Sequence, residues 1–251
     1  MLDETRSDDI VVLTLDQPKR RNALSKAMRD SLTTAFERLD RDDTVRTIIL
    51  VGAGNMFCSG GDVSEMDVAT DAEADERIRL IHHMVRVIAG CPKLVIAAIE
   101  GWAVGAGLSL ALLCDTIIAS ESAKFVASFG KMGLLGDLGA LHTLPARVGL
   151  AQARQMLFYA EPLDARAAQA LGLVDHVTST GRALDDAIER AALVRTMAPR
   201  SIALTKAIFA QDLERMLAVE KKLQPQLYLS ADHIEAKRAF LEKRVPTFLN
   251  R

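Results

Sequence analysis

The chain has 251 residues, of which 49% are hydrophobic and 25% are charged, as in an ordinary soluble globular protein. This length allows one large domain, or one domain with a smaller appendage. The net charge is −2, with acidic and basic residues interspersed, so we expect neither nucleic acid nor an anionic membrane surface as a partner.

Three further features of the sequence bear on the cellular compartment and on metal binding. No apolar run reaches the length of a transmembrane helix, and the acidic, polar N-terminus is unlike a secretory signal. The three cysteines are odd in number and lack metal-like spacing, and the five histidines form no HExxH motif. We therefore expect a cytoplasmic protein without a metal site.

The first half of the chain alternates between strand and helix signals. Buried strands are predicted at residues 10–15, 47–51, 94–99 and 115–120. Helices are predicted at residues 26–40, 77–89 and 108–114. Apolar strands separated by amphipathic helices indicate an α/β fold with a parallel sheet.

Beyond about residue 150, strand signals nearly vanish. Helices are predicted at residues 151–160, 164–172, 184–198, 201–211 and 213–243. Pro162 and Pro199 are candidate helix starts, and Gly172 is a candidate cap at a helix C-terminus. This amphipathic region has no sheet of its own, so we expect it to pack on the core or on a neighbouring subunit.

Two glycine-rich turns each follow a buried strand. One contains Gly60, Gly61 and Asp62, and the other spans residues 101–107 and leads directly into a helix. Glycine allows backbone N–H groups to approach a ligand closely, so two facing turns can together form an oxyanion hole. Either turn alone is also explained as a tight strand-to-helix connection. The spacing G-x-x-x-G-x-G is not that of a dinucleotide-binding motif.

Four stretches, in this order and spacing, resemble the crotonase superfamily, also called the enoyl-CoA hydratase/isomerase superfamily. They are RRNALS (20–25), FCSGGDVSEM (57–66), AAIEGWAVGAGLSLALLCD (97–115) and FGKMGLLGDLGALHTLPARVG (129–149). The resemblance covers nearly the whole chain. It implies a core of repeated ββα units at residues 1–195 with an acyl-CoA site, and a helical C-terminal region at 196–251 that builds homotrimers or dimers of trimers.

The resemblance also implies roles for particular residues. The oxyanion-hole N–H groups fall on Gly61 and Ala106, and coenzyme A enters as part of the substrate, with no separate cofactor. The other positions that match substrate-binding parts of the family are Arg21, Ala23, Leu24, Gly60, Asp62, Val63, Gly105, Ser109, Phe129, Leu134, Phe240 and Lys243. For the basic pair Arg20 and Arg21, a solvated loop is an equal alternative to contact with CoA phosphates.

The chain departs from the family at the two glutamates that hydratases use. Ser109 and Phe129 stand at those positions, so the pair that activates water and delivers a proton is missing. Asp137 remains, at a position where several isomerases carry a catalytic aspartate. Burial among apolar neighbours would raise its pKa toward that of a general base, although Asp137 is also placed to cap the following helix.

Other polar and aromatic residues receive weaker assignments. Asp62 is expected to hydrogen-bond within its own turn, and Trp102 is expected in the core rather than in the pocket wall. His82 and His83 are expected to be partly exposed on a helix. His142 is expected to pack near Asp137, not to act as the base.

These observations favour a CoA-thioester isomerase in which one aspartate moves a proton between two carbons. A hydratase or hydrolase with an unusual base is the first alternative. A third reading takes Ser109 as the nucleophile of an incomplete G-x-S-x-G elbow. A fourth is an acyl-CoA-binding protein without catalytic activity.

Overall fold

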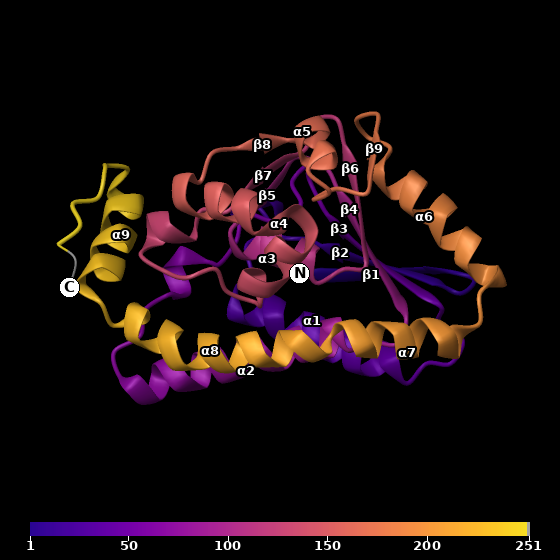
Figure 1. Ribbon diagram of the computed structural model, residues 1–251, viewed down its shortest axis with the longest axis horizontal. Helices are drawn as coiled ribbons and strands as arrows, with labels where there is room; N and C mark the ends of the chain where they lie inside the picture. Colours follow the sequence, from indigo (N-terminus) through magenta and orange to yellow (C-terminus); the bar gives the residue numbers. More distant parts are fainter. Residues whose placement is uncertain (250–251) are drawn as a thin grey trace.

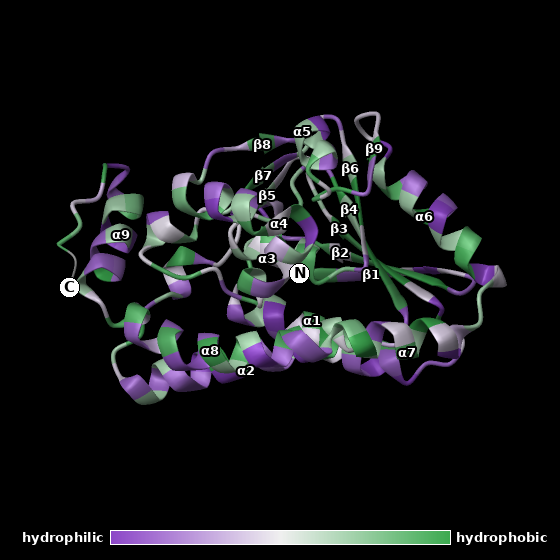
Figure 2. Ribbon diagram, in the orientation of Figure 1, coloured by the Kyte–Doolittle hydropathy of each residue, from purple (hydrophilic) through white to green (hydrophobic). Residues whose placement is uncertain are grey.

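A six-stranded sheet forms the centre of the computed structural model, which describes residues 1–249 (Figure 1). In spatial order its strands are β1 (Leu2–Ser7), β2 (Ile10–Leu15), β3 (Thr47–Gly52), β4 (Leu94–Ile99), β6 (Thr116–Ser120) and β9 (His176–Thr178). Strand β1 pairs antiparallel with β2, and every other pair is parallel. The apolar runs of β2, β3, β4 and β6 reflect burial on both faces (Figure 2).

A second sheet is built from three short strands, β5 (Trp102–Val104), β7 (Lys124–Val126) and β8 (Leu163–Asp164). The chain passes from the large sheet to the small one and then into a helix, as β4–β5–α3 and β6–β7–α4. These are the repeated ββα units that the resemblance implied, so the expected fold class is confirmed.

Helices cover both faces of the large sheet. The helices that precede the C-terminal region are α1 (Lys26–Asp40), α2 (Asp71–Ala89), α3 (Ala106–Leu112), α4 (Ala140–Tyr159), α5 (Ala165–Ala170) and α6 (Ala183–Leu193). Helices α1 to α4 contribute to the larger apolar core. The opposite face is covered by the small side chains of α6, which pack on isoleucines and valines of β2, β3, β4 and β6.

The C-terminal region consists of α7 (Pro199–Phe209), α8 (Gln211–Tyr228) and α9 (Ala231–Glu242). Helix α8 runs beside α2, and α9 lies at one end of the molecule (Figure 1). Helix α7 has no buried residue, whereas α8 buries an apolar stripe that includes Leu213, Leu217 and Tyr228. None of the helices within residues 1–249 combines the length and the apolar character needed to cross a bilayer.

Several boundaries differ from the sequence prediction. Helix α2 begins at Asp71 instead of near residue 77, because the Thr70 side chain caps the N–H of Glu73 and acidic residues occupy the first turn. Pro162 does not start a helix, since Asp164 caps α5. Pro199 does begin α7, and Gly172 follows α5 with a φ of 81°.

Strands β1, β5, β7, β8 and β9 were not predicted. Strand β1 is almost entirely exposed and polar, and the others have only two or three residues. Such segments carry too little apolar periodicity to be recognised, and their pairing with neighbouring strands decides their conformation.

Candidate active site

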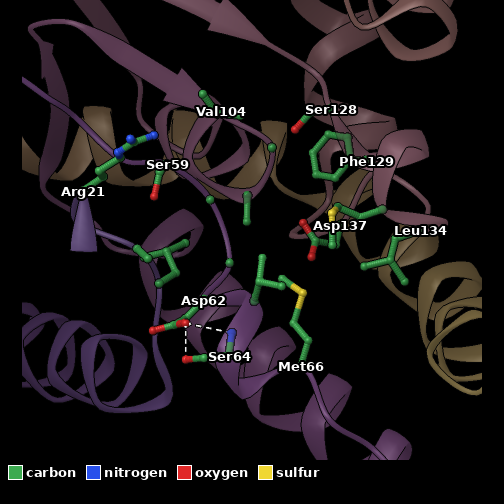
Figure 3. Close-up of a pocket in the computed structure, with 18 of the residues that line it drawn as sticks. Arg21, Ser59, Asp62, Ser64, Met66, Val104, Ser128, Phe129, Leu134 and Asp137 are labelled. Carbon is green, nitrogen blue, oxygen red and sulfur yellow. Dashed lines mark hydrogen bonds between the residues drawn. The ribbon is translucent and has the colours of Figure 1, made fainter. Parts of the chain in front are cut away.

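A pocket of about 830 Å³ lies where the two glycine-rich turns meet the loop before α4 and the ends of α8 and α9. It brings together all the predicted site residues except Ser109 and Lys243. Those lining it are Arg21, Ala23, Leu24, Gly60, Gly61, Asp62, Val63, Gly105, Ala106, Phe129, Leu134, Asp137 and Phe240. Figure 3 shows Arg21 and Asp137 on opposite sides of the hollow.

Backbone hydrogen bonds hold the two glycine-rich turns side by side. The N–H of Cys58 donates to the carbonyl of Trp102 at 3.0 Å, and the N–H of Val104 donates to the carbonyl of Cys58 at 3.0 Å. Gly60 then turns with a φ of 100°, and a Cβ there would lie 2.8 Å from the carbonyl oxygen of Val104. Only glycine allows this close approach without strain.

The next residue in each turn lines the pocket and has a backbone N–H group without a partner among the described residues. Gly61 follows the tight turn, and Ala106 is the first residue of α3, where no intrahelical acceptor exists. Within residues 1–249, neither N–H group donates to a protein acceptor. Two free N–H groups on adjacent rigid segments are suited to binding one ligand oxygen.

Asn22 fixes the loop that forms another wall of the pocket. Its side chain is fully buried, accepts from the N–H of Gln17 at 2.9 Å, and donates to the carbonyls of Ala53 and Met56 at 2.9 and 2.6 Å. The N–H of Leu24 then donates to the carbonyl of Gly60 at 2.8 Å. This hydrogen bond ties the loop at residues 22–24 to the first glycine-rich turn.

Asp62 stabilises its own turn, as its sequence context predicted. Its carboxylate accepts from the N–H of Ser64 at 3.0 Å and from the Ser64 hydroxyl at 2.6 Å (Figure 3). It also pairs with Arg20 at 2.8 Å. Burial acts to raise the pKa of Asp62, but the hydrogen bonds from Ser64 and Arg20 outweigh it and leave the pKa below the usual value. The hydrogen bonds of Asp62 are therefore used to hold its own turn.

Asp137 is in the opposite situation. It is buried in the pocket wall with 8% exposure, and its Oδ1 has no hydrogen-bond partner within the described residues. Burial, followed by repulsion from Glu220, raises its pKa to about 7. The capping alternative is wrong, because α4 begins after Gly139 without a side-chain cap.

A buried carboxylate supports the backbone directly behind Asp137. Leu138 and Gly139 both have positive φ angles, 52° and 75°, and their consecutive N–H groups meet the same carboxylate. They donate to the two oxygens of Glu220 at 3.1 and 3.0 Å. His82 lies 3.0 Å from Glu220 and is buried, which corrects the expectation that it is partly exposed.

Sequence reasoning did not identify Glu220 as part of the site. The signal was its position: Leu213, Leu217, Glu220, Gln224 and Tyr228 share the buried face of α8. A charged residue on the buried face of a helix needs a buried partner. That partner, the turn at residues 138–139, became evident only in the tertiary structure.

Two other expectations, those for Ser109 and Trp102, need correction, and the expected contact of Lys243 with CoA stays a prediction. Ser109 is fully buried, and its hydroxyl donates to the carbonyl of Gly105 at 3.4 Å, so it neither lines the pocket nor resembles an activated nucleophile. Lys243 is the exposed cap of α9 outside the pocket lining. Trp102 is 39% exposed and lines the pocket, because β5 is an edge strand whose residue 102 faces outward from the core.

No set of three or more His, Cys, Asp or Glu residues within residues 1–249 is arranged to hold a metal ion. The pocket's carboxylates are Asp62 and Asp137. Asp62 is held by hydrogen bonds, whereas Asp137 is left to accept a proton. Together with the N–H groups of Gly61 and Ala106, which can polarise a carbonyl, Asp137 equips the site for proton transfer.

Fold and site together define a member of the crotonase superfamily. The family model for "Enoyl-CoA hydratase/isomerase" matches residues 5–251, and the chain belongs to this family of acyl-CoA enzymes. A solved enoyl-CoA hydratase from Mycobacterium avium subsp. paratuberculosis superimposes with a TM-score of 0.90 at 33% identity, covering 99% of this chain and 98% of that one.

Relatives within the family carry different activities in their names. A probable enoyl-CoA hydratase of Rhodobacter capsulatus is 38% identical over 98% of this chain and 96% of its own length. The 1,2-epoxyphenylacetyl-CoA isomerase of Escherichia coli is 34% identical over 95% of this chain and 94% of its own. The mitochondrial methylglutaconyl-CoA hydratase of Mus musculus is 34% identical over 98% of this chain and 81% of its own.

Proposed function

We propose that the protein is an enoyl-CoA isomerase that shifts a double bond by moving one proton. The observation that carries this proposal is Asp137, an unpartnered, buried carboxylate in the pocket wall with a pKa raised to about 7. A general base is most effective when its pKa lies near the working pH. A relative in E. coli is named as an isomerase of a CoA thioester, with an epoxide as its named substrate.

In the proposed reaction, the thioester oxygen of a 3-enoyl-CoA accepts hydrogen bonds from the N–H groups of Gly61 and Ala106. Ionised Asp137 removes a proton from C2, and the electron pair spreads into a dienolate whose negative oxygen is held by the two N–H groups. The protonated Asp137 then returns the proton to C4. The product is the 2-enoyl-CoA of the same mass.

The rest of the pocket is assigned to binding the CoA thioester. We assign Arg21, at the exposed rim, to the CoA phosphates, because Arg20 is already paired with Asp62. Phe240 extends the lining from α9. No cofactor is needed besides the CoA that the substrate carries.

Hydration is the second candidate, because relatives named as hydratases match nearly the whole chain. At the two glutamate positions, however, this chain has Ser109 and Phe129. Ser109 is fully buried and does not line the pocket, and Phe129 lines it with an apolar ring. Asp137 alone would then have to activate water and also arrange proton delivery to C2.

The deciding experiment offers 3-enoyl-CoA and 2-enoyl-CoA separately and follows thioester conjugation by absorbance and product mass. Conjugation of the 3-enoyl ester without a mass change is expected. Asp137→Asn should reduce kcat by about 10² to 10⁴, the usual contribution of a general base. Addition of one water would show a hydratase, release of CoA a hydrolase, and binding without turnover a protein that only binds acyl-CoA.

We also propose that the chain assembles as a homotrimer or a dimer of trimers. The support is the apolar surface of the C-terminal helices, where Leu204, Ile208, Phe209, Leu223 and Leu241 are exposed. Light scattering coupled to size-exclusion chromatography will give the mass of the assembly. The three buried, unpaired cysteines suit a reducing compartment such as the cytoplasm.

A further inference from the structure

Two arginines line the pocket at the same end as Asp137 and have no role in the steps above. Arg29 comes from the first turn of α1 and Arg77 from α2, and both are half-buried. Both act electrostatically on Asp137 and on Tyr228, which lines the same end of the pocket. They are thus separate from Arg21, which lies on the far side of the hollow from Asp137 (Figure 3).

The protein satisfies only part of each guanidinium group. Arg29 donates to the carbonyl of Leu24 at 2.5 Å, and Arg77 donates to the carbonyl of Glu65 at 2.8 Å. The Arg77 guanidinium also lies 5.4 Å from the centre of the Tyr228 ring. A guanidinium has five N–H donors, and the buried Nε of Arg77 has no hydrogen-bond partner among the described residues.

Carboxylates act on the two positive charges without direct contact: Asp137 acts on both arginines, and Glu65 and Asp30 act on Arg29. Neither arginine forms an ion pair with a carboxylate within residues 1–249, although the same region of the chain contains many such pairs. Burial and the nearby Arg77 charge lower the pKa of Arg29. Two cations held together in a partly dry pocket are unfavourable unless an anion joins them.

We propose that Arg29 and Arg77 form a subsite for a carboxylate at the end of the acyl chain remote from the thioester. The substrate class is then the CoA monothioesters of dicarboxylic acids. The planar donor fork of a guanidinium matches a carboxylate in geometry and charge, which favours this anion over a neutral polar group. The CoA phosphates are assigned to Arg21 on the other side of the pocket. The thioester then lies between Arg21 and the pair formed by Arg29 and Arg77.

This inference deepens the proposed function and rests on acyl-CoA binding in the same pocket. Its test is equilibrium binding of two saturated esters, glutaryl-CoA and pentanoyl-CoA, measured by titration calorimetry. They have the same chain length and differ in the terminal group. Because neither carries a double bond, the result does not depend on whether the enzyme is an isomerase or a hydratase.

The unmodified protein is expected to bind glutaryl-CoA about tenfold or more tightly than pentanoyl-CoA, as charge-assisted hydrogen bonds allow. Arg77→Met should abolish this preference, Arg29→Met should reduce it, and Arg77→Lys should keep part of it. The matched control Arg21→Met, at the rim, should weaken both esters by the same factor. Added salt should reduce the preference in the unmodified protein.

Equal binding of the two esters by the unmodified protein would overturn the proposal. So would an Arg77→Met variant that loses affinity for both esters equally, since this would show that the arginine only holds the backbone of Glu65. Retained affinity for pentanoyl-CoA in Arg77→Met and Arg29→Met shows that each variant is folded. If Arg77→Met does not fold, Arg29→Met and the comparison of esters on the unmodified protein still decide the question.

Discussion

Replacing Asp137 with asparagine is expected to stabilise the folded protein at alkaline pH while it removes activity. Burial in the pocket wall raises the pKa of this carboxyl from 3.8 to about 7. The folded protein therefore holds the proton more tightly than the unfolded chain does. Stability falls as the pH rises from about 4 through about 7, because the folded state must then carry a buried charge.

The magnitude follows from the size of the shift. Each pKa unit corresponds to 1.36 kcal/mol, so the rise from 3.8 to about 7 means that ionising Asp137 costs about 4 kcal/mol of stability. Asparagine is nearly the same size and does not titrate. The free energy of unfolding of Asp137→Asn relative to the unmodified protein should therefore grow by about 3 kcal/mol between pH 5 and pH 8.

Urea unfolding at a fixed protein concentration, repeated at pH 5 and pH 8, measures this difference, because assembly of subunits also affects apparent stability. In thermal unfolding the same change corresponds to roughly 6 to 12 °C in Tm. Asp62→Asn is the matched control: the pKa of Asp62 is lowered below 3.8, so its stabilising contribution is complete above that pH and the difference from the unmodified protein should stay constant from pH 5 to pH 8. If Asp137→Asn and the unmodified protein keep a constant difference from pH 5 to pH 8, Asp137 has no raised pKa and the reasoning fails.

Three other substitutions test how the site is held. Gly60→Ala should lower kcat/KM by about 10², because its Cβ would collide with backbone and displace the neighbouring amide, whereas Gly181→Ala, with a similar φ but open space, should not. Asn22→Ala should reduce the free energy of unfolding by about 3 kcal/mol in urea titrations, since three backbone groups lose their partner. Glu220→Gln removes a buried charge behind Asp137, so the acidic limb of the kcat/KM profile should move to lower pH; an unmoved limb contradicts this coupling.

Much of this architecture follows from local sequence. The strand at Ile10–Leu15 and the helix at Lys26–Asp40 were predicted with their observed bounds, because a long apolar run or a clear 3.6-residue stripe needs little tertiary information. The paired glycines at 60–61 predicted a turn in which the backbone lies close to another segment. The structure shows that the other segment is the backbone at Val104.

Motif resemblance predicted more of the site than residue chemistry alone did. It placed Gly61, Ala106 and Asp137 in one pocket, although they are far apart in the chain. For Asp137 the local sequence favoured a helix cap. The structure excludes this role, since the turn at Leu138 and Gly139 separates the carboxylate from the helix start.

Tertiary structure alone decided which polar groups meet in the interior. Glu220 receives the N–H groups of residues 138 and 139 from more than 80 positions away, and Arg29 of α1 and Arg77 of α2 converge on Tyr228 of α8. Periodicity shows that a residue faces inward but not what it meets there. The charge state of Asp137 depends on these distant neighbours and on the loss of water around it, which is why its raised pKa emerges only once the chain is folded.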